Sequence, residues 1–254
     1  MTDPERTTPR YLGPDTSGRK DQMTRAEIQG RFDREVAALY SQRDPLWLPE
    51  FRRMFSLIPK LLQPALEQGG TFLDIGAGTG NLSRSVLEVF PQARAVLMDF
   101  SANMLSEVPN VLAAFVGRFE TLAADFIEAD FGIEHYGAVI SSFAIHHCRG
   151  EKEYGRVYQK AFRALRNNGI FVCCDVIAGA SQALSDLNEN GWREFLSAQG
   201  MEAAEVERIL SNYHVEDSPI SMAAHFSLLR EAGFTEVDVV YKRDNFGIYT
   251  GSKR

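Results

Sequence analysis

A glycine-rich turn is the segment of this sequence with the clearest chemical content. Residues 72–81 read FLDIGAGTGN, an apolar strand that runs into three closely spaced glycines and then into a helix. Glycines lack Cβ atoms, so the backbone can pass close beneath a ligand. A dinucleotide-binding turn would carry its third glycine at position 81, which is Asn81 here. Asp74 would repel a pyrophosphate and attract a cation, so the turn favours a positively charged nucleoside without phosphates.

Two further aspartates follow apolar segments that read as the next strands. Asp99 lies 25 residues after Asp74, where a carboxylate can accept hydrogen bonds from both hydroxyls of a ribose. It could instead be the N-cap of the helix that follows. Asp130 ends the next predicted strand and could accept a hydrogen bond from an adenine amino group, or simply stabilise a turn. Together the three aspartates predict a site for an adenosine-containing ligand.

Two adjacent histidines follow the fourth predicted strand, in the segment SSFAIHHC at 141–148. A histidine titrates near neutrality and can remove a proton from a reacting group. The pair could alternatively bind loop backbone and shape a pocket. We take His146 and His147 as candidate catalytic residues, with a slight preference for His146.

The elements that must position these residues form an alternating pattern from Thr71 onward. Short apolar strands alternate with helices, which predicts a parallel sheet with crossover helices. The predicted strands are Thr71–Ile75, Ala93–Met98, Ala124–Glu128, Ala138–Phe143 and Ile170–Val176, and the predicted helices are Asn81–Phe90, Ala102–Val116 and Glu151–Leu165. A hairpin of Val237–Tyr241 and Phe246–Tyr249 ends the domain. The fold class expected is α/β, a Rossmann-like seven-stranded, mostly parallel sheet with an antiparallel C-terminal strand.

Helical segments outside this pattern are expected to cover the site. Residues 1–22 are predicted to be a flexible tail and residues 23–254 a single domain. Within the domain, residues 23–69 form an N-terminal helical cover that starts at a Thr24–Glu27 capping box, and residues 181–215 form a helical lid insertion. Six aromatic residues of these segments are candidate substrate contacts: Tyr40, Trp47, Phe51, Trp192, Phe195 and Tyr213.

Composition excludes several classes of function. The net charge is −7, from 27 basic and 34 acidic residues, which disfavours nucleic-acid binding. The sequence lacks an apolar run of the ~18 residues that a membrane-spanning helix needs. The three cysteines lack metal-ligand spacing, so we predict no metal site and interpret them as reduced thiols of a cytoplasmic protein.

Taken together, residues 70–251 resemble the class I S-adenosylmethionine (SAM) dependent methyltransferases. In that family the glycine turn, the acidic residue that ends the second strand and the aspartate after the third strand line the cofactor. The resemblance implies a cofactor site for SAM and its product S-adenosylhomocysteine, formed by Asp74, Gly76, Ala77, Gly78, Gly80, Asp99, Phe100, Met104, Asp130, Phe131 and Ser142. It also implies a small-molecule methyl acceptor, and the sequence leaves a homodimer open.

Within this family the sequence is most similar to the carboxy-SAM synthase group and nearby small-molecule methyltransferases. The shared segments are Phe32-Asp33-x-x-Val36-Ala37, Pro49-x-Phe51, Leu228-Leu229-x-x-Ala232-Gly233-Phe234 and Asn245-Phe246-Gly247. The tyrosine of that group's pocket falls on Phe51, and the arginine that grips the extra carboxylate falls on Ser197. We therefore expect ordinary methyl transfer to an O, N or C atom. The alternatives are a carboxy-SAM synthase, a tRNA-modifying enzyme, a non-catalytic SAM-binding subunit and a nicotinamide oxidoreductase.

Overall fold

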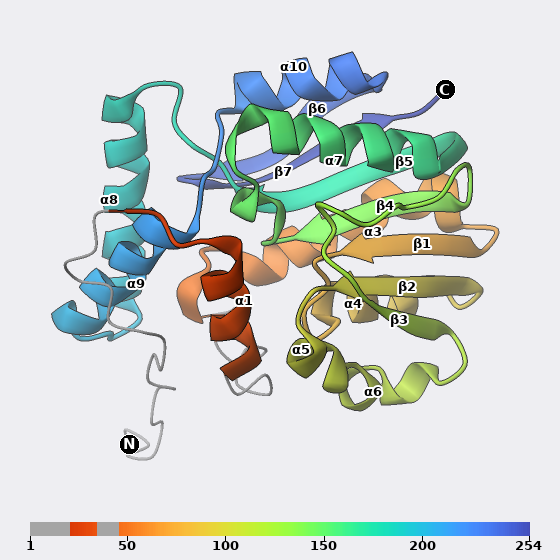
Figure 1. The fold of residues 1–254 in the computed structure, drawn as a ribbon, viewed down its shortest axis with the longest axis horizontal. Coiled ribbons are helices and arrows are strands. Elements are labelled where there is room, and N and C mark those ends of the chain that lie inside the picture. Colours follow the sequence, from red (N-terminus) through yellow and green to blue (C-terminus); the bar gives the residue numbers. More distant parts are fainter. Residues whose placement is uncertain (1–20, 35–45) are drawn as a thin grey trace.

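A seven-stranded sheet is the centre of the protein in a computed structural model that describes residues 21–34 and 46–254. The strand order is β3-β2-β1-β4-β5-β7-β6 (Figure 1). Only β7 runs against its neighbours β5 and β6, so the predicted fold class is confirmed. The strands are β1 (Gly70–Ile75), β2 (Ala93–Asp99), β3 (Phe119–Ala123), β4 (Tyr136–Ser142), β5 (Leu165–Val176), β6 (Thr235–Arg243) and β7 (Phe246–Ser252).

The central strands are apolar because helices cover both of their faces. In β1 the last four residues are buried, and Asp74 is one of them. The parallel register places Ile75 beside Met98, so β1 and β2 end at the same edge of the sheet. The glycine turn after β1 and Asp99 at the end of β2 are therefore neighbours.

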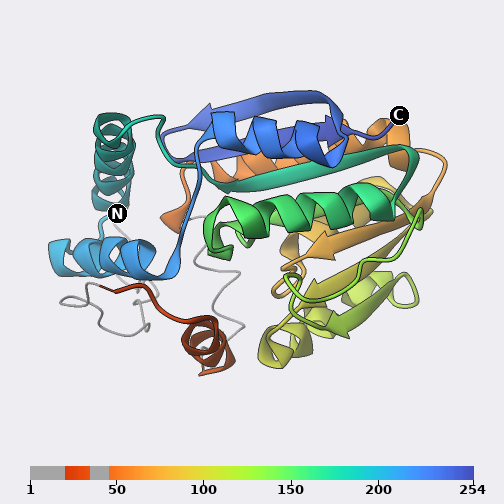
Figure 2. The ribbon, with the colours of Figure 1, turned by 45° about the horizontal axis from the view of Figure 1, so that its top comes forward.

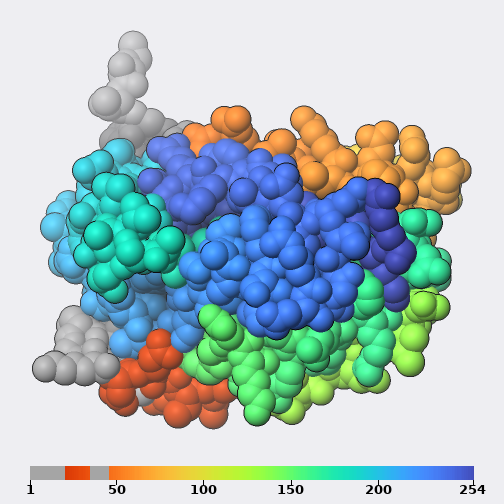
Figure 3. Space-filling view, turned by 90° about the horizontal axis from the view of Figure 1, so that it is seen from above, coloured from red at the N-terminus to blue at the C-terminus, as the bar shows by residue number. Residues whose placement is uncertain are grey.

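Helices pack on the two faces of the sheet in separate hydrophobic cores (Figures 1 and 2). One face is covered by α3 (Phe51–Leu66) and α4 (Asn81–Val89), where Ile58 and Leu62 are fully buried. The other face is covered by α7 (Gly150–Ala164) and α10 (Met222–Ala232), which lie side by side (Figure 3). None of the helices in the described residues is long and apolar enough to cross a membrane.

Three further helices lie together at one end of the molecule. These are α1 (Arg25–Arg34), α8 (Gln182–Ala198) and α9 (Ala203–Glu216), seen beside the sheet in Figure 1 and at one end of Figure 3. The predicted capping box is present, because Thr24 N–H donates to Glu27 Oε2 over 2.7 Å and Glu27 N–H donates to Thr24 Oγ1.

The third strand differs from the prediction. β3 is Phe119–Ala123, five residues before the predicted Ala124–Glu128. β3 is an edge strand whose last four residues are exposed, so it lacks an apolar run. The apolar residues Phe126 and Ile127 lie in the following loop and pack into the core formed with α7. Their hydrophobicity marks burial and not a strand.

The predicted helix Ala102–Val116 is also wrong as a single element. It is divided into α5 (Ala102–Ser106), α6 (Val108–Val111) and the 3₁₀ turn η1 (Ala113–Phe115). Pro109 stands in the first turn of α6, where its missing N–H is tolerated, but it cannot continue the hydrogen bonding of α5.

Candidate cofactor and acceptor sites

The glycine turn is held against the ends of the neighbouring strands. Ala77 N–H donates to the Met98 carbonyl over 3.0 Å, and Gly78 N–H donates to Asp99 Oδ2 over 2.8 Å. Gly76 has φ +66°, and a Cβ there would lie 2.2 Å from Ala144 Cβ. Gly78 has φ +55°, yet a Cβ there would meet nothing within 4 Å. The first glycine therefore permits close packing, whereas Gly78 faces open space.

That open space is a cavity of about 740 Å³, counting its open mouth. It lies beyond the carboxyl ends of β1, β2 and β4, where the strand order reverses, the usual ligand position in such sheets. Seven residues predicted for the cofactor line it: Gly76, Ala77, Gly78, Asp99, Phe100, Met104 and Ser142. His147, predicted as a catalytic candidate, also lines it. Sequence reasoning missed the other lining residues, which are Phe32, Phe55, Thr79, Asn81, Leu82, Phe126, Phe143 and Ala144.

Asp99 is the acidic residue of this cavity and is only 6% exposed. Its two oxygens accept from different backbone groups, Oδ2 from Gly78 N–H and Oδ1 from Ser101 N–H, each over 2.8 Å. Ser101, and not Asp99, caps α5 by accepting from Met104 N–H. Burial raises the pKa of Asp99 to about 6, although the two N–H donors lower it. Each oxygen keeps a lone pair that a ribose hydroxyl could use.

Asp74 lies beneath the turn and does not line the cavity. Its side chain is fully buried, and Oδ2 accepts from Ser83 Oγ over 2.7 Å. Within the described residues Oδ1 has no hydrogen-bond partner. Burial raises the pKa of Asp74 to about 7, which the Ser83 hydrogen bond opposes and the nearby Asp99 reinforces. Gly80, the other predicted residue here, is the N-cap of α4 and also lies outside the lining.

Asp130 and Phe131 are not placed as the sequence predicted. The Asp130 side chain is 70% exposed, pairs with Arg163 and accepts from Gly132 N–H over 3.1 Å. Phe131 is buried in the core under α7. Because β3 ends at Ala123, the residues at its carboxyl end are Asp125 and Phe126. Phe126 lines the cavity, and Asp125 Oδ1 accepts from Ile127 N–H over 2.8 Å.

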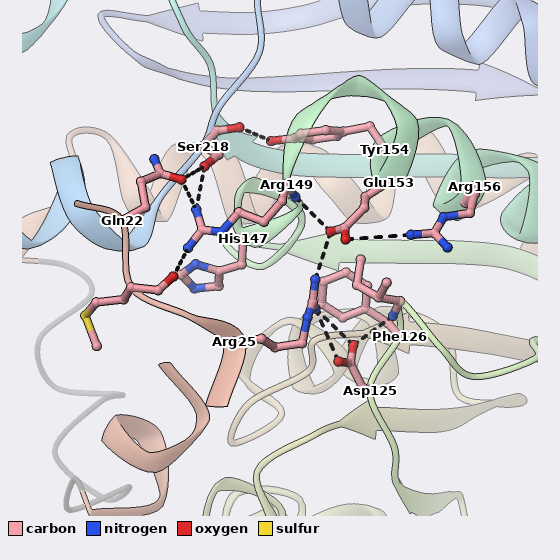
Figure 4. Close-up of polar contacts among 12 residues, drawn as sticks. Gln22, Arg25, Asp125, Phe126, His147, Arg149, Glu153, Tyr154, Arg156 and Ser218 are labelled. Carbon is pink, nitrogen blue, oxygen red and sulfur yellow. Dashed lines mark hydrogen bonds and ion pairs between the residues drawn. The ribbon is translucent and has the colours of Figure 1, made fainter. Parts of the chain in front are cut away.

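Ion pairs and hydrogen bonds hold α1 and the residues just before it over this region (Figure 4). Arg25 binds Asp125 over 3.2 Å and Glu153 over 2.8 Å, so it joins α1 to the loop after β3 and to α7. Arg149 donates from Nη2 to the carbonyls of Met23 and Glu216, each over 2.9 Å. This contact network, which we call the α1 latch, holds Phe32 of α1 in the cavity wall.

A second cavity of about 780 Å³, counting its mouth, adjoins the first and shares three residues with it, Phe32, Phe143 and His147. Phe143 follows β4 with φ +50°, a strained value for a bulky residue that is common at functional sites. Three predicted aromatic contacts, Trp47, Trp192 and Tyr213, line this cavity. Phe51 and Phe195 do not, and Tyr40 lies outside the described residues.

The two histidines occupy different places around these cavities. Both lie in the 3₁₀ turn η2 (Ile145–His147), but only His147 reaches the first cavity as well as the second. His146 Nδ1 lies 2.5 Å from Asp175 Oδ1, and its Nε2 lies 3.4 Å from Asp217 Oδ1. Sequence reasoning missed both carboxylates. Asp175 could have been noticed as a polar residue near the end of an apolar strand, whereas Asp217 follows α9 without a recognisable motif.

Their electrostatics also differ. Burial alone would lower the pKa of His146, but the carboxylates of Asp217 and Asp175 outweigh it and raise that pKa to about 9. Burial, the His146 charge and Arg31 lower the pKa of His147 well below its usual value. Near neutral pH His146 therefore carries a proton on each nitrogen, while His147 is neutral.

Comparison with known proteins agrees with this geometry. Residues 72–169 match the family described as "Methyltransferase domain". The carboxy-S-adenosyl-L-methionine synthase of Nautilia profundicola is 24% identical over 236 residues, covering 89% of this chain and 96% of that protein. The same enzyme of Sulfurimonas denitrificans is 27% identical over 238 residues, covering 89% and 95%.

Solved structures share the fold. A phosphoethanolamine N-methyltransferase of Haemonchus contortus, in complex with SAM, superposes with a TM-score of 0.66 at 14% identity and covers 91% of this chain. A putative O-methyltransferase of Nostoc punctiforme superposes with a TM-score of 0.61 at 18% identity and covers 86%. This chain spans 60% of the length of each of these two structures.

The first cavity suits SAM by its own chemistry. Gly78 leaves room above the turn, Asp99 offers buried carboxylate oxygens to a ribose, and Phe100, Met104 and Phe126 offer apolar surface to an adenine. The turn carries no Lys or Arg that would bind a phosphate. With the match of residues 72–169 to the methyltransferase-domain family and the strand order, these features agree with a class I SAM-dependent methyltransferase domain.

Proposed function

We propose that this protein transfers a methyl group from SAM in the first cavity to a small molecule in the second. The observation that supports this most directly is the wall of Phe32, Phe143 and His147 that the two cavities share. Ligands on either side of that wall would meet at the ends of β1 and β4, so a donor and an acceptor could lie within reach of each other.

Positioning is the main contribution that we assign to the chain. When bound, SAM supplies an activated methyl group on a sulfonium, and aligning an acceptor with it can provide much of the rate. Phe143 and Phe32 would fix the two ligands from opposite elements, β4 and α1. Of the two histidines, His147 is the better candidate to accept a proton, because it is neutral and borders both cavities. His146 is already protonated and bound to Asp175.

The charge of the second cavity supports methyl transfer over carboxy-SAM synthesis. Among the described residues that line either cavity, Arg31 is the single Arg or Lys, and its guanidinium lies 2.6 Å from Glu216. Ser197, the position expected for a carboxylate-binding arginine, is exposed and donates to the Arg193 carbonyl over 2.9 Å. Glu216 and Asp217 offset the positive charges of Arg31 and His146 in the same cavity, so among the described residues no positive charge is left over for a second carboxylate. We therefore expect a neutral acceptor and an unmodified cofactor.

Calorimetric titration of the full chain with SAM, S-adenosylhomocysteine and carboxy-SAM tests this proposal. We expect the first two to bind and carboxy-SAM to bind at least ~10-fold more weakly, since 1.4 kcal/mol of uncompensated charge is enough for that difference. An acceptor panel should then yield S-adenosylhomocysteine. Carboxy-SAM that co-purifies with the protein, or that binds more tightly than SAM, would favour the synthase reading that the relatives' names suggest.

A further inference from the structure

His146, His147 and Asp217 bring three metal-ligand atoms together at the boundary of the two cavities. One ligand atom of each residue lies within 4.8 Å of the other two, and the atoms that face Asp217 Oδ1 are His146 Nε2 and His147 Nδ1. The residues come from the η2 turn and from the end of α9, which are far apart in the sequence. We propose that they bind one divalent transition-metal ion, of the Zn²⁺ or Fe²⁺ type, that faces the acceptor cavity.

The distances within this cluster fit metal ligands better than they fit hydrogen bonds. Asp217 Oδ1 lies 3.4 Å from His146 Nε2 and 3.4 Å from His147 Nδ1. Hydrogen bonds from nitrogen to oxygen normally measure about 2.7–3.2 Å. Ligands held about 2.0–2.1 Å from a tetrahedral zinc ion are separated by about 3.4 Å. The distance from each histidine nitrogen to Asp217 Oδ1 is therefore the distance expected between two ligands of one metal ion.

The Asp217 carboxylate gives a reason for a cation to be there. Within the described residues its side chain pairs only with the two histidines, while Arg31 and Arg149 contribute positive charge from farther away. Its side chain is 13% exposed, so water compensates it poorly. Two histidines and one carboxylate form a donor set that suits Zn²⁺ and Fe²⁺.

Asp175 acts as the outer support that metal-binding histidines usually have. It holds His146 Nδ1 over 2.5 Å and thereby leaves Nε2 to point at the cluster, where a bound metal ion would displace the Nε2 proton. Asp175 is itself fixed, because it accepts from Val176 N–H over 2.8 Å and from His146 N–H over 3.0 Å. The orientation of one ligand is therefore set before any ion arrives.

The position of the cluster suggests what the ion would do. All three ligands line the second cavity, so the remaining coordination positions would open towards the acceptor. An acceptor hydroxyl or amine bound there would lose its proton more readily than in water. Metal binding itself does not depend on this role, so it can be tested without knowing the acceptor.

The test is metal binding by the full chain after removal of bound ions with a chelator. Titration with Zn²⁺ should give one site per chain, and Co²⁺ should give visible absorption bands typical of nitrogen and oxygen ligands in a low-coordinate site. Asp217→Asn should weaken Zn²⁺ binding at least ~100-fold. Changes to a residue that only supports a metal ligand weaken binding by up to about 100-fold, and Asp217 is a ligand itself. Asp175→Asn should weaken it about 10–100-fold.

His214→Gln is the matched control, because His214 also pairs with a carboxylate, Glu189 over 3.1 Å, but is 57% exposed, lines neither cavity and is not one of the three proposed ligands. It should bind Zn²⁺ like the wild type. SAM titration confirms that each variant is folded. The proposal is overturned if the wild-type protein binds no stoichiometric Zn²⁺, or if Asp217→Asn and His214→Gln lose the same Zn²⁺ affinity. The three residues would then form an imidazolium–carboxylate cluster. If Asp217→Asn does not fold, the wild-type cobalt spectrum and Asp175→Asn decide the question alone.

Discussion

Replacing Asp99 by Asn separates the role of this residue in the fold from its role in SAM binding. The carboxylate accepts Gly78 N–H on one oxygen and Ser101 N–H on the other. An asparagine has one acceptor oxygen, so one buried N–H would face the amide nitrogen, at a cost of about 1–3 kcal/mol. In the opposite direction, the pKa of Asp99 rises from 3.8 to about 6, so ionising it at pH 8 costs about 3 kcal/mol.

These two effects nearly cancel in the ligand-free protein. We therefore expect the melting temperature of Asp99→Asn at pH 8 to stay within a few degrees of the wild type. SAM binding should respond differently, because the ribose would lose a charge-assisted acceptor worth about 1.5–3 kcal/mol. That loss corresponds to a Kd roughly 10- to 150-fold higher. Thermal melting and calorimetric titration with SAM measure the two quantities separately.

Asp130→Asn is the matched control for this prediction. It removes the same charge from the residue that sequence reasoning placed at the adenine, but in the structure Asp130 is exposed and away from the cavity. Its SAM affinity should equal that of the wild type. A folded Asp99→Asn protein with unchanged affinity would refute the ribose assignment, and weaker SAM binding by Asp130→Asn would refute the corrected position of β3.

Three further predictions concern the turn, the buried aspartate beneath it and the α1 latch. Gly76→Ala should fail to fold or to bind SAM because its Cβ would clash with Ala144, whereas Gly78→Ala should fold with a stability loss of about 1–2 kcal/mol and lose SAM affinity, as measured by melting and titration. If both variants behave alike, the two glycines do not have the different roles assigned here. The pKa of Asp74 rises from 3.8 to about 7, so the folded state binds more protons than the unfolded state between these values and stability falls as pH rises. Asp74→Asn should therefore raise the free energy of unfolding of the ligand-free protein by up to about 4 kcal/mol at pH 8 and by much less at pH 4. Melting temperatures at the two pH values measure this. A gain in stability that does not change with pH would contradict the prediction. Arg25→Ala should speed SAM dissociation about 3- to 10-fold in stopped-flow measurements, since a partly buried ion-pair network of this kind contributes about 1 kcal/mol. Arg156→Ala, which touches Glu153 without reaching α1, should leave that rate unchanged.

The sequence predicted the part of the fold whose signals are local. β1, β2, β4 and β5 are apolar because both faces are covered, and the glycine turn directly follows the first of them. β3 was misplaced because an edge strand needs no apolar run, whereas the loop after it does pack into the core. The shift placed the expected adenine contacts at Asp130 and Phe131, which lie outside the lining of the first cavity, whereas Phe126 lies within it. One shifted strand therefore displaced two of the expected positions.

The cavity walls were harder to predict because distant segments supply them. Phe32 comes from α1, Phe55 from α3 and Phe143 from the end of β4, and each would pass for an ordinary core residue in the sequence. Aromatic residues at helical spacing carry no mark of which ones face a ligand. Only the packing of α1 through its latch brings Phe32 to both cavities.

The position of α1 predicts an energetic coupling between the two cavities. Phe32 contributes to both walls, and its neighbour Arg31 is bound to Glu216 in the second cavity. A ligand in either cavity that favours the docked position of α1 would also favour ligand binding in the other, because the same helix closes both. Such a coupling must be reciprocal: if an acceptor lowers the Kd of SAM by some factor, SAM must lower the Kd of the acceptor by the same factor. Weakening the latch through Arg25→Ala should reduce that factor, which places control of both sites in a helix that holds neither the glycine turn nor the histidines.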